Sequence, residues 1–351
     1  MRYTIAAIPG DGIGGEVLPA GQQVLEAAAT RWGFQLEWNA VDWGCEYYTR
    51  TGAMMPEDGL SRLAEHDAVF LGAVGYPGVP DHVSLWGLLI PIRRAFRQFV
   101  NHRPIRLFEG IDSPLRHTDG GIDFVVVREN NEGEYSEVGG RMYRGREDEI
   151  AIQESVFTRR GVRDVVRYAF ELAGQRSGRV MSATKSNGIV HTMPFWDEIV
   201  REVAHEYPAV DVGQQHVDAL AAHFVQRPQD LDVVVASNLF GDILSDLGAA
   251  VAGSIGIAPS ANLDPGKEHP SMFEPVHGSA PDIAGRGIAN PIGQIWSGAL
   301  MLQHLGQDRA GTAIIDAIAT VLGQGGPRTP DLGGRATTTE VADAVVDALA
   351  G

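Results

Sequence analysis

Short runs of β-branched residues alternate with longer stretches of helical hydrophobic spacing along this chain. The predicted strands are 4–8, 68–74, 124–127, 180–184 and 233–237. The predicted helices are 16–29, 90–100, 242–252, 311–322 and 339–349, and Thr337 with Glu340 has the spacing of a capping box before the last of them. Strands that alternate with helices indicate an α/β protein with a largely parallel sheet. The Gly- and Pro-rich segment 256–281 is predicted to be a long loop, and such loops usually carry function.

The composition is that of a globular protein with a sizeable core. Of 351 residues, 44% are apolar and 21% are charged, which predicts two packed domains or one large α/β unit. The net charge of −17 argues against binding nucleic acid or an anionic membrane through a general basic surface. A single cysteine, Cys45, allows no internal disulfide and fits a reducing, cytoplasmic location. We find no secretory signal and no apolar run of 18 residues.

A glycine-rich turn, 9–15, follows the first predicted strand and opens the first helix. Gly10, Gly12 and Gly15 match the G-x-G-x-x-G pattern of dinucleotide-binding turns. The acidic partner expected after the next strand could be Asp42, which lies further along than usual and in an aromatic, polar segment. The pattern therefore favours a tight strand-to-helix turn near an active site, with a Rossmann-type site as the alternative.

Arginines are spaced along the predicted helix 90–100 and its exit, at Arg93, Arg97 and Arg103. Because a guanidinium binds carboxylate as a planar fork, several that converge suit a di- or tricarboxylate substrate. A solvated helix face is the alternative. Arg128 ends a predicted strand, and ligands gather at the carboxyl ends of parallel strands.

Lysine is rare, with only Lys185 and Lys267 in the chain. Lys185 directly follows the predicted strand 180–184, where a turn presents side chains to a site. An ammonium loses its proton when it is desolvated or near other cations, whereas a guanidinium effectively does not. We therefore favour a general-base role for Lys185 and interpret Lys267 as a solvated surface charge.

Asp242 and Asp246 are four residues apart in a predicted helix and share one face of it. Two carboxylates this close repel each other unless a cation lies between them, and oxygen-only ligands suit Mg²⁺ or Mn²⁺ rather than zinc. Asp218 is a candidate third ligand. The equally weighted alternative is that Asp242 caps the helix while Asp246 is solvated.

The segment 274–285 is the densest run of glycine, small residues and hydrogen-bonding side chains. Small residues let a backbone approach a flat ligand, and a following carboxylate can accept both ribose hydroxyls while repelling a 2′-phosphate. Asp282 therefore predicts NAD rather than NADP, with a structural Ω-like loop as the alternative.

Together these segments resemble the β-decarboxylating dehydrogenases, the family of isopropylmalate, isocitrate, homoisocitrate, tartrate and D-malate dehydrogenases. The resemblance runs from residue 8 to the helix around 299–302 and beyond, and it is most specific at 238–246 and 274–290. Within the family, the segments 85–87, 128–136 and 182–188 look most like D-malate and tartrate dehydrogenases.

The resemblance implies an α/β fold that is not of the Rossmann type, with two domains that share a large mixed sheet around an active-site cleft. The large domain would comprise residues 1–98 and 256–351 and carry the NAD adenosine loop. A central domain, 99–255, would carry the dimer interface and the metal-binding aspartates. The resemblance also implies a homodimer with shared active sites, or a higher oligomer built from it.

Residue roles follow from the family motifs that the chain matches. Arg93, Arg103 and Arg128 would bind the substrate carboxylates, Tyr135 would be the general acid, and Lys185 of the partner subunit would be the general base. Mg²⁺ or Mn²⁺ would be held by Asp242, Asp246 and the partner subunit's Asp218. NAD would be bound near its nicotinamide by Asn187 and in its adenosine half by His277, Gly278, Ser279, Ala280, Asp282 and Asn290.

The implied activity is NAD-dependent oxidative decarboxylation of a 2-hydroxy dicarboxylate, with D-malate, converted to pyruvate and CO₂, ahead of tartrate. Isopropylmalate enzymes resemble one another in an acidic residue followed by paired leucines, where this chain has Trp86 and then Leu89 and Ile90. Arg93 favours D-malate over tartrate, and 3-isopropylmalate is the alternative substrate. A non-catalytic regulatory subunit is disfavoured because Tyr135, Lys185 and the three aspartates are all present. A binding-only or structural protein would not explain the arginines opposite those acids.

Overall fold

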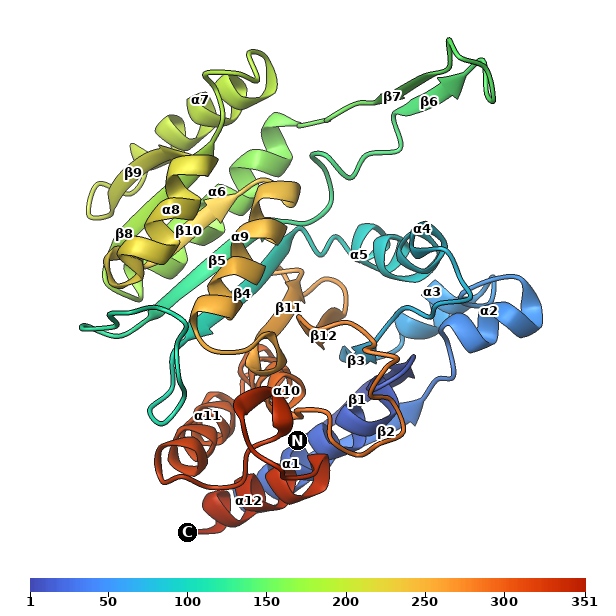
Figure 1. The fold of residues 1–351 in the computed structure, drawn as a ribbon, viewed down its shortest axis with the longest axis vertical. Coiled ribbons are helices and arrows are strands. Elements are labelled where there is room, and N and C mark those ends of the chain that lie inside the picture. Colours follow the sequence, from blue (N-terminus) through green and yellow to red (C-terminus); the bar gives the residue numbers. More distant parts are fainter.

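A ten-stranded mixed sheet runs through the computed structural model, which describes residues 1–351 (Figure 1). The strand order is β2-β1-β3-β12-β11-β4-β5-β10-β8-β9. The strands of this sheet are β1 Arg2–Gly10, β2 Gln35–Ala40, β3 Ala68–Ala73, β4 Val100–Arg106, β5 Asp123–Glu129, β8 Arg179–Thr184, β9 Asp211–His216, β10 Val233–Ala236, β11 Pro259–Leu263 and β12 Ser271–Pro275.

The sheet consists of two parallel parts joined by an antiparallel centre. The strands β2, β1, β3 and β12 pair in parallel, as do β5, β10, β8 and β9. Between them β12 pairs with β11, β11 with β4, and β4 with β5, all antiparallel. The expectation of a largely parallel sheet therefore holds for the two outer parts only, and the mixed sheet implied by the family resemblance is confirmed.

Helices cover both faces of the sheet. Figure 1 shows α1, α10, α11 and α12 gathered at one end, and α6, α7, α8 and α9 around the other. The helices are α1 Gly14–Trp32, α2 Cys45–Thr51, α3 Gly59–Leu63, α4 Asp81–Ser84, α5 Ile90–Ala95, α6 Arg159–Gly174, α7 Thr192–Ala204, α8 Val217–Gln226, α9 Asn238–Val251, α10 Ile292–His304, α11 Asp308–Gly323 and α12 Thr338–Ala350. None of them is both long and apolar enough to cross a membrane.

Most of the predicted elements are present, and the capping box at Thr337 is confirmed: its Oγ1 accepts from Glu340 N at 3.2 Å, and its N–H donates to Glu340 Oε2 at 2.8 Å. Two predictions are wrong. The segment 256–281 is not one long loop, because it contains β11 and β12. Both strands are buried throughout, yet they contain residue types typical of loops, such as Pro259, Asn262 and Pro275, and the connection between them is rich in Gly and Pro.

The second wrong prediction is the helix 90–100. The helix α5 ends at Ala95, Arg97 has a left-handed backbone (φ +48°), and β4 begins at Val100. Arg103 consequently projects from a strand at the centre of the sheet and not from a helix exit.

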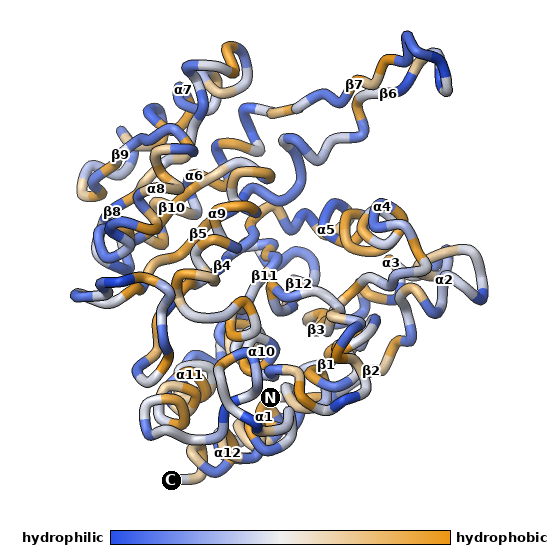
Figure 2. Tube along the Cα trace, in the orientation of Figure 1, coloured by the Kyte–Doolittle hydropathy of each residue, from blue (hydrophilic) through white to orange (hydrophobic).

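The hydrophobic core forms two main clusters on the sheet. The larger extends from β1 through the central strands to α12, and the smaller packs α2 and α5 on β1 and β3 through residues such as Trp43, Leu71 and Leu88. In Figure 2 the apolar positions follow the strands and the inner faces of the helices. This packing fixes the strand ends from which the site residues project.

A two-stranded arm, β6 Gly139–Met142 and β7 Ile150–Gln153, extends away from the sheet (Figure 1). All eight strand residues are exposed, among them Met142, Ile150 and Ile152. The arm therefore presents several exposed apolar side chains, and exposed apolar patches mark interaction sites.

We expect a buried histidine on β4 to contribute to the loss of unfolding free energy at acid pH. His102 lies beneath α6, with Nδ1 3.1 Å from the Tyr168 hydroxyl. Burial, and next the charge of Arg176, lower the pKa of His102 from 6.5 to about 4. Between these two values the unfolded chain binds a proton that the folded chain does not, so the free energy of unfolding falls as the pH falls.

We expect His102→Gln to show a smaller loss of unfolding free energy than the parent between about pH 7 and about pH 5, measured by urea denaturation. Substitution of the exposed His205 by Gln should leave the parental pH dependence unchanged. An equal loss in the His102→Gln variant and the parent would contradict this account.

Candidate active site

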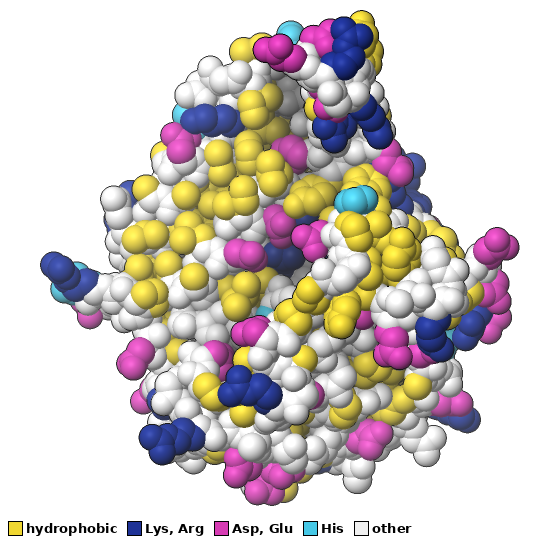
Figure 3. All heavy atoms as spheres, turned by 45° about the vertical axis from the view of Figure 1, so that its right-hand side comes forward, with side chains coloured by type: hydrophobic (Ala, Val, Ile, Leu, Met, Phe, Trp, Pro, Cys, Tyr) yellow, Lys and Arg dark blue, Asp and Glu magenta, His cyan; other side chains and the backbone are white.

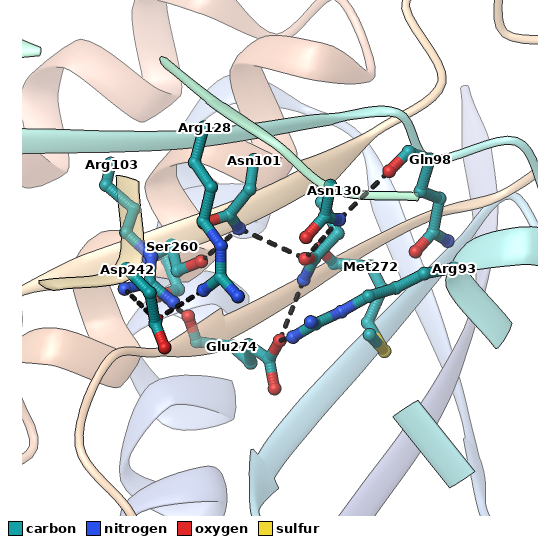
Figure 4. A network of polar contacts seen from close by, with 12 residues as sticks. Arg93, Gln98, Asn101, Arg103, Arg128, Asn130, Asp242, Ser260, Met272 and Glu274 are labelled. Atoms are coloured by element: carbon teal, nitrogen blue, oxygen red, sulfur yellow. Dashed lines mark hydrogen bonds and ion pairs between the residues drawn. The ribbon is translucent and has the colours of Figure 1, made fainter. Parts of the chain in front are cut away.

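The centre of the sheet brings two buried arginines against one carboxylate. Arg103 on β4 and Arg128 at the end of β5 both point toward Asp242 on the first turns of α9 (Figure 4). Arg103 Nη1 donates to Asp242 Oδ1 at 3.2 Å, and Arg128 forms an ion pair with the same oxygen. Arg128 is held in place by Asn238 Oδ1, which accepts from its Nε at 3.0 Å and from its Nη2 at 2.7 Å.

A cation does lie between the two aspartates of α9, and it is a guanidinium. Arg103 Nη1 lies 3.2 Å from Asp242 and 3.5 Å from Asp246, and it donates to Ser245 Oγ at 2.6 Å. Asp242 does not simply cap the helix, because its carboxylate contacts side chains of β4 and β5. The alternative of a plain helix cap is therefore wrong for this residue.

The electrostatics of the cluster leave Asp242 ionised. Burial opposes ionisation, but Arg128 and Arg103 outweigh it and lower the pKa of Asp242. Burial raises the pKa of Asp246, which contacts only one arginine. Burial, and then the nearby Arg103, lower the pKa of Arg128 to about 10. The arginines are crowded enough that a further negative charge beside them is favourable.

Tyr135 adds a hydroxyl hydrogen-bond donor to this cluster. Its hydroxyl donates to Asp242 Oδ2 at 3.2 Å, and Arg128 Cζ lies 5.5 Å from the centre of its ring. Burial, and next the charge of Asp242, raise the pKa of Tyr135. The phenol is therefore protonated at neutral pH and can act as a proton donor.

Arg93 reaches the same region through a second buried ion pair. Its Nη2 donates to Glu274 Oε1 at 2.9 Å, and Asn262 Nδ2 donates to that oxygen at 2.8 Å (Figure 4). Asn101 Nδ2 donates to Asn262 Oδ1 at 3.0 Å. The Nε groups of Arg93 and Arg103 are buried without a partner, and buried donors of this kind favour a ligand with acceptor oxygens.

Residues of this network outside the sequence-based set include Asn101, Asn238, Asn262 and Glu274. Asn238 and Glu274 stand in segments that the sequence singled out, but only the fold shows which arginine each one orients. Arg97, by contrast, lies outside the cluster. It forms an exposed pair with Glu268 at 3.2 Å, so the solvated alternative holds for it.

Lys185 and Asp218 form a separate exposed pair. Lys185 follows β8, Asp218 follows β9, and Lys185 Nζ donates to Asp218 Oδ1 at 2.5 Å. This hydrogen bond lowers the pKa of Asp218. No three acidic, histidine or cysteine side chains of one chain come together in a metal-binding group. A single chain therefore does not bring Asp218 to Asp242 and Asp246.

Lys267, the other lysine, lies in the exposed connection between β11 and β12, where its Nζ donates to the His304 carbonyl at 2.5 Å. It takes no part in the arginine cluster. Its placement agrees with the interpretation as a surface charge.

The glycine-rich turn packs against the segment 277–282. Ile13 N donates to Ser279 O at 2.8 Å, and a Cβ on Gly12 would lie 2.1 Å from the same oxygen, so glycine is needed at position 12. The Asp42 carboxylate forms an exposed ion pair with Arg50 at 2.7 Å. The structure therefore favours a turn that shapes the neighbouring loop over a Rossmann-type site.

A cavity of about 590 Å³ lies between the loop 74–81 and residues Gly278, Ser279 and Pro281. Beside it His277 is buried, its Nδ1 lies 3.0 Å from the Gly278 carbonyl, and its Nε2 has no partner. Burial lowers the pKa of His277, so its ring is neutral. The cavity and the unpartnered nitrogen fit a polar, flat ligand.

Three other predicted cofactor residues lie in different surroundings. Asp282 and Asn187 are exposed and make no side-chain hydrogen bond. Asn290 is buried, and its amide donates to Asp331 at 2.9 Å while its oxygen accepts from Ile292 N. In this structure Asn290 therefore stabilises the start of α10.

The surface view shows a hollow between the two parts of the molecule, in which acidic and basic side chains meet (Figure 3). The rim of the hollow is largely hydrophobic. A hollow lined by opposite charges suits a small anionic ligand that is enclosed on several sides.

Comparisons with known proteins show which proteins the chain is similar to. The chain matches the family described as isocitrate/isopropylmalate dehydrogenase over residues 4–345. It is 58% identical to the D-malate dehydrogenase (decarboxylating) of Escherichia coli strain K12, with 97% of each chain covered. It is 56% identical to the probable tartrate dehydrogenase/decarboxylase of Bacillus subtilis strain 168, with 99% of this chain and 98% of the relative covered.

Solved structures show the same fold. The isocitrate dehydrogenase from Methylococcus capsulatus superposes with a TM-score of 0.90 at 34% identity, covering 99% of this chain and 100% of the other. A β-decarboxylating dehydrogenase from Thermococcus kodakarensis superposes with a TM-score of 0.81 at 36% identity, covering 99% and 96%.

The ion pairs predict how much each of the two aspartates contributes to the free energy of unfolding. In metal-free solution Asp242→Asn should lower the free energy of unfolding by about 1–3 kcal/mol, because it leaves two buried guanidiniums without their shared countercharge. Asp246→Asn, which removes a more exposed and longer contact, should cost less than about 1 kcal/mol. Urea denaturation in the presence of a chelator measures both values, and the reverse order would contradict the assigned pairing.

Proposed function

Because the chain belongs to the isocitrate/isopropylmalate dehydrogenase family, we propose that it catalyses the NAD-dependent oxidative decarboxylation of a small 2-hydroxy dicarboxylate. D-malate, which would give pyruvate and CO₂, is the first candidate substrate and tartrate the second. The observation that carries the proposal is the convergence of Arg103, Arg128 and Tyr135 on Asp242. Full-length relatives bearing the names of D-malate and tartrate dehydrogenases support the choice of substrate.

Three arginines provide the binding charge for a dicarboxylate. Arg93, Arg103 and Arg128 are nearly buried, and two of them retain an unpartnered Nε. A guanidinium in a dry site binds carboxylate more strongly than one in water. We assign these three residues to the carboxylates of the substrate.

The divalent cation requires ligands from two subunits. Asp242 and Asp246 supply carboxylates from one face of α9, and the partner subunit's Asp218 would complete an oxygen-only set that fits Mg²⁺ or Mn²⁺. When bound, the cation would polarise the 2-hydroxyl of the substrate and stabilise negative charge on its oxygen. The proposed metal site therefore depends on the three aspartates and on assembly of the dimer.

Members of this family use a nicotinamide cofactor, and we propose that it is NAD. The cavity beside Gly278 and Ser279, the unpartnered Nε2 of His277 and the nearby Ala280 suit the adenosine half. We assign Asp282 and Asn290 to that half as well, and Asn187 to the nicotinamide end. NAD, when bound, accepts the hydride from C2 of the substrate.

Two residues move protons in this scheme. Lys185 Nζ of the partner subunit takes the proton of the 2-hydroxyl as general base. After CO₂ has left, the Tyr135 hydroxyl gives its proton to C3. The raised pKa of Tyr135 means that the phenol is protonated at neutral pH.

The proposed homodimer supplies Lys185 and Asp218 across the interface. Exposed apolar side chains follow Lys185 at Ile189 and Val190, and Ile243 is exposed on α9 between the two aspartates. The arm formed by β6 and β7 is exposed as well. Apolar patches near both halves of the site support an assembly that joins them. We propose residues 1–98 with 256–351, and 99–255, as the two domains that face each other across the site.

Turnover by the purified protein tests the proposed function. With NAD and Mn²⁺, we expect kcat/KM to fall in the order D-malate, tartrate, 3-isopropylmalate, and chelation of the metal to abolish NADH formation. Lys185→Ala should lower kcat by about 10²- to 10⁴-fold, the usual contribution of a general base. Lys267→Ala, which removes the only other lysine, should leave kcat unchanged.

A preference for 3-isopropylmalate would overturn the substrate assignment and leave the reaction class intact. No turnover of any of these dicarboxylates would overturn the proposed function itself.

A further inference from the structure

Arg94 connects two segments that are distant in the sequence, the turn around Trp86 and the loop around Tyr135. It is the last arginine of α5, and its Cζ lies 5.0 Å from the centre of the Trp86 ring. Its Nη1 donates to Glu137 Oε2 at 2.7 Å, and its Nη2 donates to the carbonyl oxygen of Tyr135 at 3.0 Å. One guanidinium therefore contacts the segment before Arg93 with its face and the Tyr135 segment with its edge.

The Tyr135 segment has little regular structure of its own, and side-chain contacts position its backbone. Residues 130–138, between β5 and β6, form no helix or strand. Both neighbours of Tyr135 are held by side-chain hydrogen bonds, since the Glu134 carboxylate accepts from Leu239 N at 3.0 Å and Ser136 Oγ donates to the Glu154 carbonyl. No backbone N–H donates to the carbonyl of Tyr135, so Arg94 is its hydrogen-bond donor.

The Trp86 segment is irregular as well. Residues Leu85–Leu89 form a π-helical turn between α4 and α5, a conformation found frequently at functional sites. Trp86 stands where the family resemblance places the residue that faces the C3 substituent of the substrate. The stack of Arg94 on the indole therefore links the segment that the resemblance assigns to substrate selection to the segment that carries the Tyr135 phenol.

Arg94 differs from the arginines assigned to the substrate. Its side chain is 32% exposed, against 9% for Arg93 and 4% for Arg128, and both of its terminal nitrogens already have protein partners. Its donors are directed at Glu137 and at the Tyr135 carbonyl, and not at Asp242 or Glu274, so Arg94 lies outside the charge cluster that is assigned to the substrate.

We propose that Arg94 is a positioning residue that, braced against Trp86, holds the backbone of Tyr135 so that its phenol meets the reacting carbon. The proposal rests on the proposed function, in which Tyr135 is the proton donor. It predicts that Arg94 affects the chemical step and not substrate binding. It also predicts that Lys cannot replace it, since a compact ammonium cannot stack and donate in two fixed directions as a planar fork does.

A double-mutant cycle tests the coupling, with D-malate, NAD and Mn²⁺ as the assay. Arg94→Met should lower kcat by about 10- to 100-fold, the scale of effect that small misplacements of catalytic groups have. KM for D-malate should change by less than about threefold, because the three binding arginines are untouched. Arg94→Lys should behave like Arg94→Met.

The decisive comparison is made in a Tyr135→Phe background. There the phenol is already absent, so adding Arg94→Met should lower kcat by less than about twofold. Glu137→Gln, which removes an exposed partner of Arg94 and leaves the stack intact, should lower kcat by a few-fold in the parent and not in Tyr135→Phe. This second variant keeps the test decisive if Arg94→Met folds poorly.

Arg50→Met is the matched control. Arg50 also has an ion pair of 2.7 Å, with Asp42, and lies over an aromatic ring, that of Tyr47, at 5.7 Å, but it is remote from Tyr135. Its replacement should change neither kcat nor KM.

Equal effects of Arg94→Met in the parent and in Tyr135→Phe would overturn the positioning role, as would an effect on KM alone. If the parent protein itself turns over no dicarboxylate, the proposed function fails and the positioning role fails with it. If the parent turns over D-malate and the effects of Arg94→Met and Tyr135→Phe are additive, only the positioning role is overturned.

Discussion

Burial of three guanidiniums beside two carboxylates is the interaction on which the rest of this site depends. An isolated buried charge is strongly unfavourable, so each arginine must find a countercharge or a ligand. Arg128 and Arg103 share Asp242, while Arg93 pairs with Glu274. The cluster is close to saturated with protein partners, yet two Nε groups remain without an acceptor. This balance makes the site receptive to a small dianion and unreceptive to an apolar ligand.

The antiparallel centre of the sheet follows from the same requirement. Glu274 is on β12, Arg103 on β4 and Arg128 on β5, and the order β12-β11-β4-β5 brings these strands together at the centre of the sheet. Asn101 and Asn262 fill the space between the two ion pairs with hydrogen bonds. The fold thus supports the site by bringing together residues that are more than a hundred positions apart in the chain.

That separation explains which features the sequence could predict. Strands such as 68–74 and 124–127 are apolar runs with clear ends, and Asp242 and Asp246 share a helix face, so local patterns suffice for them. Glu274 and Asn262 were missed because nothing near them in the sequence indicates the arginine or asparagine they meet.

The antiparallel strands β11 and β12 were missed because they are buried on both faces, and the Gly- and Pro-rich connection between them dominated the pattern. Family resemblance supplied the role of Tyr135, whereas the rarity of lysine and the place of Lys185 after a strand already favoured a general base there. The structure then showed which of the predicted residues one chain brings together: Arg103, Arg128, Tyr135, Asp242 and Asp246, with Lys185 and Asp218 apart.

In the proposed dimer, this divided set becomes one site only between two subunits. The most direct measurement mixes Lys185→Ala with Asp242→Asn, each inactive alone, by coexpression with different tags. In a two-fold symmetric dimer, the mixed species has one intact site and one doubly damaged site. The account predicts recovery of about a quarter of the parental activity in a statistical mixture and about half in the purified mixed dimer. A mixed dimer as inactive as the Lys185→Ala and Asp242→Asn homodimers would contradict a site that is shared between subunits.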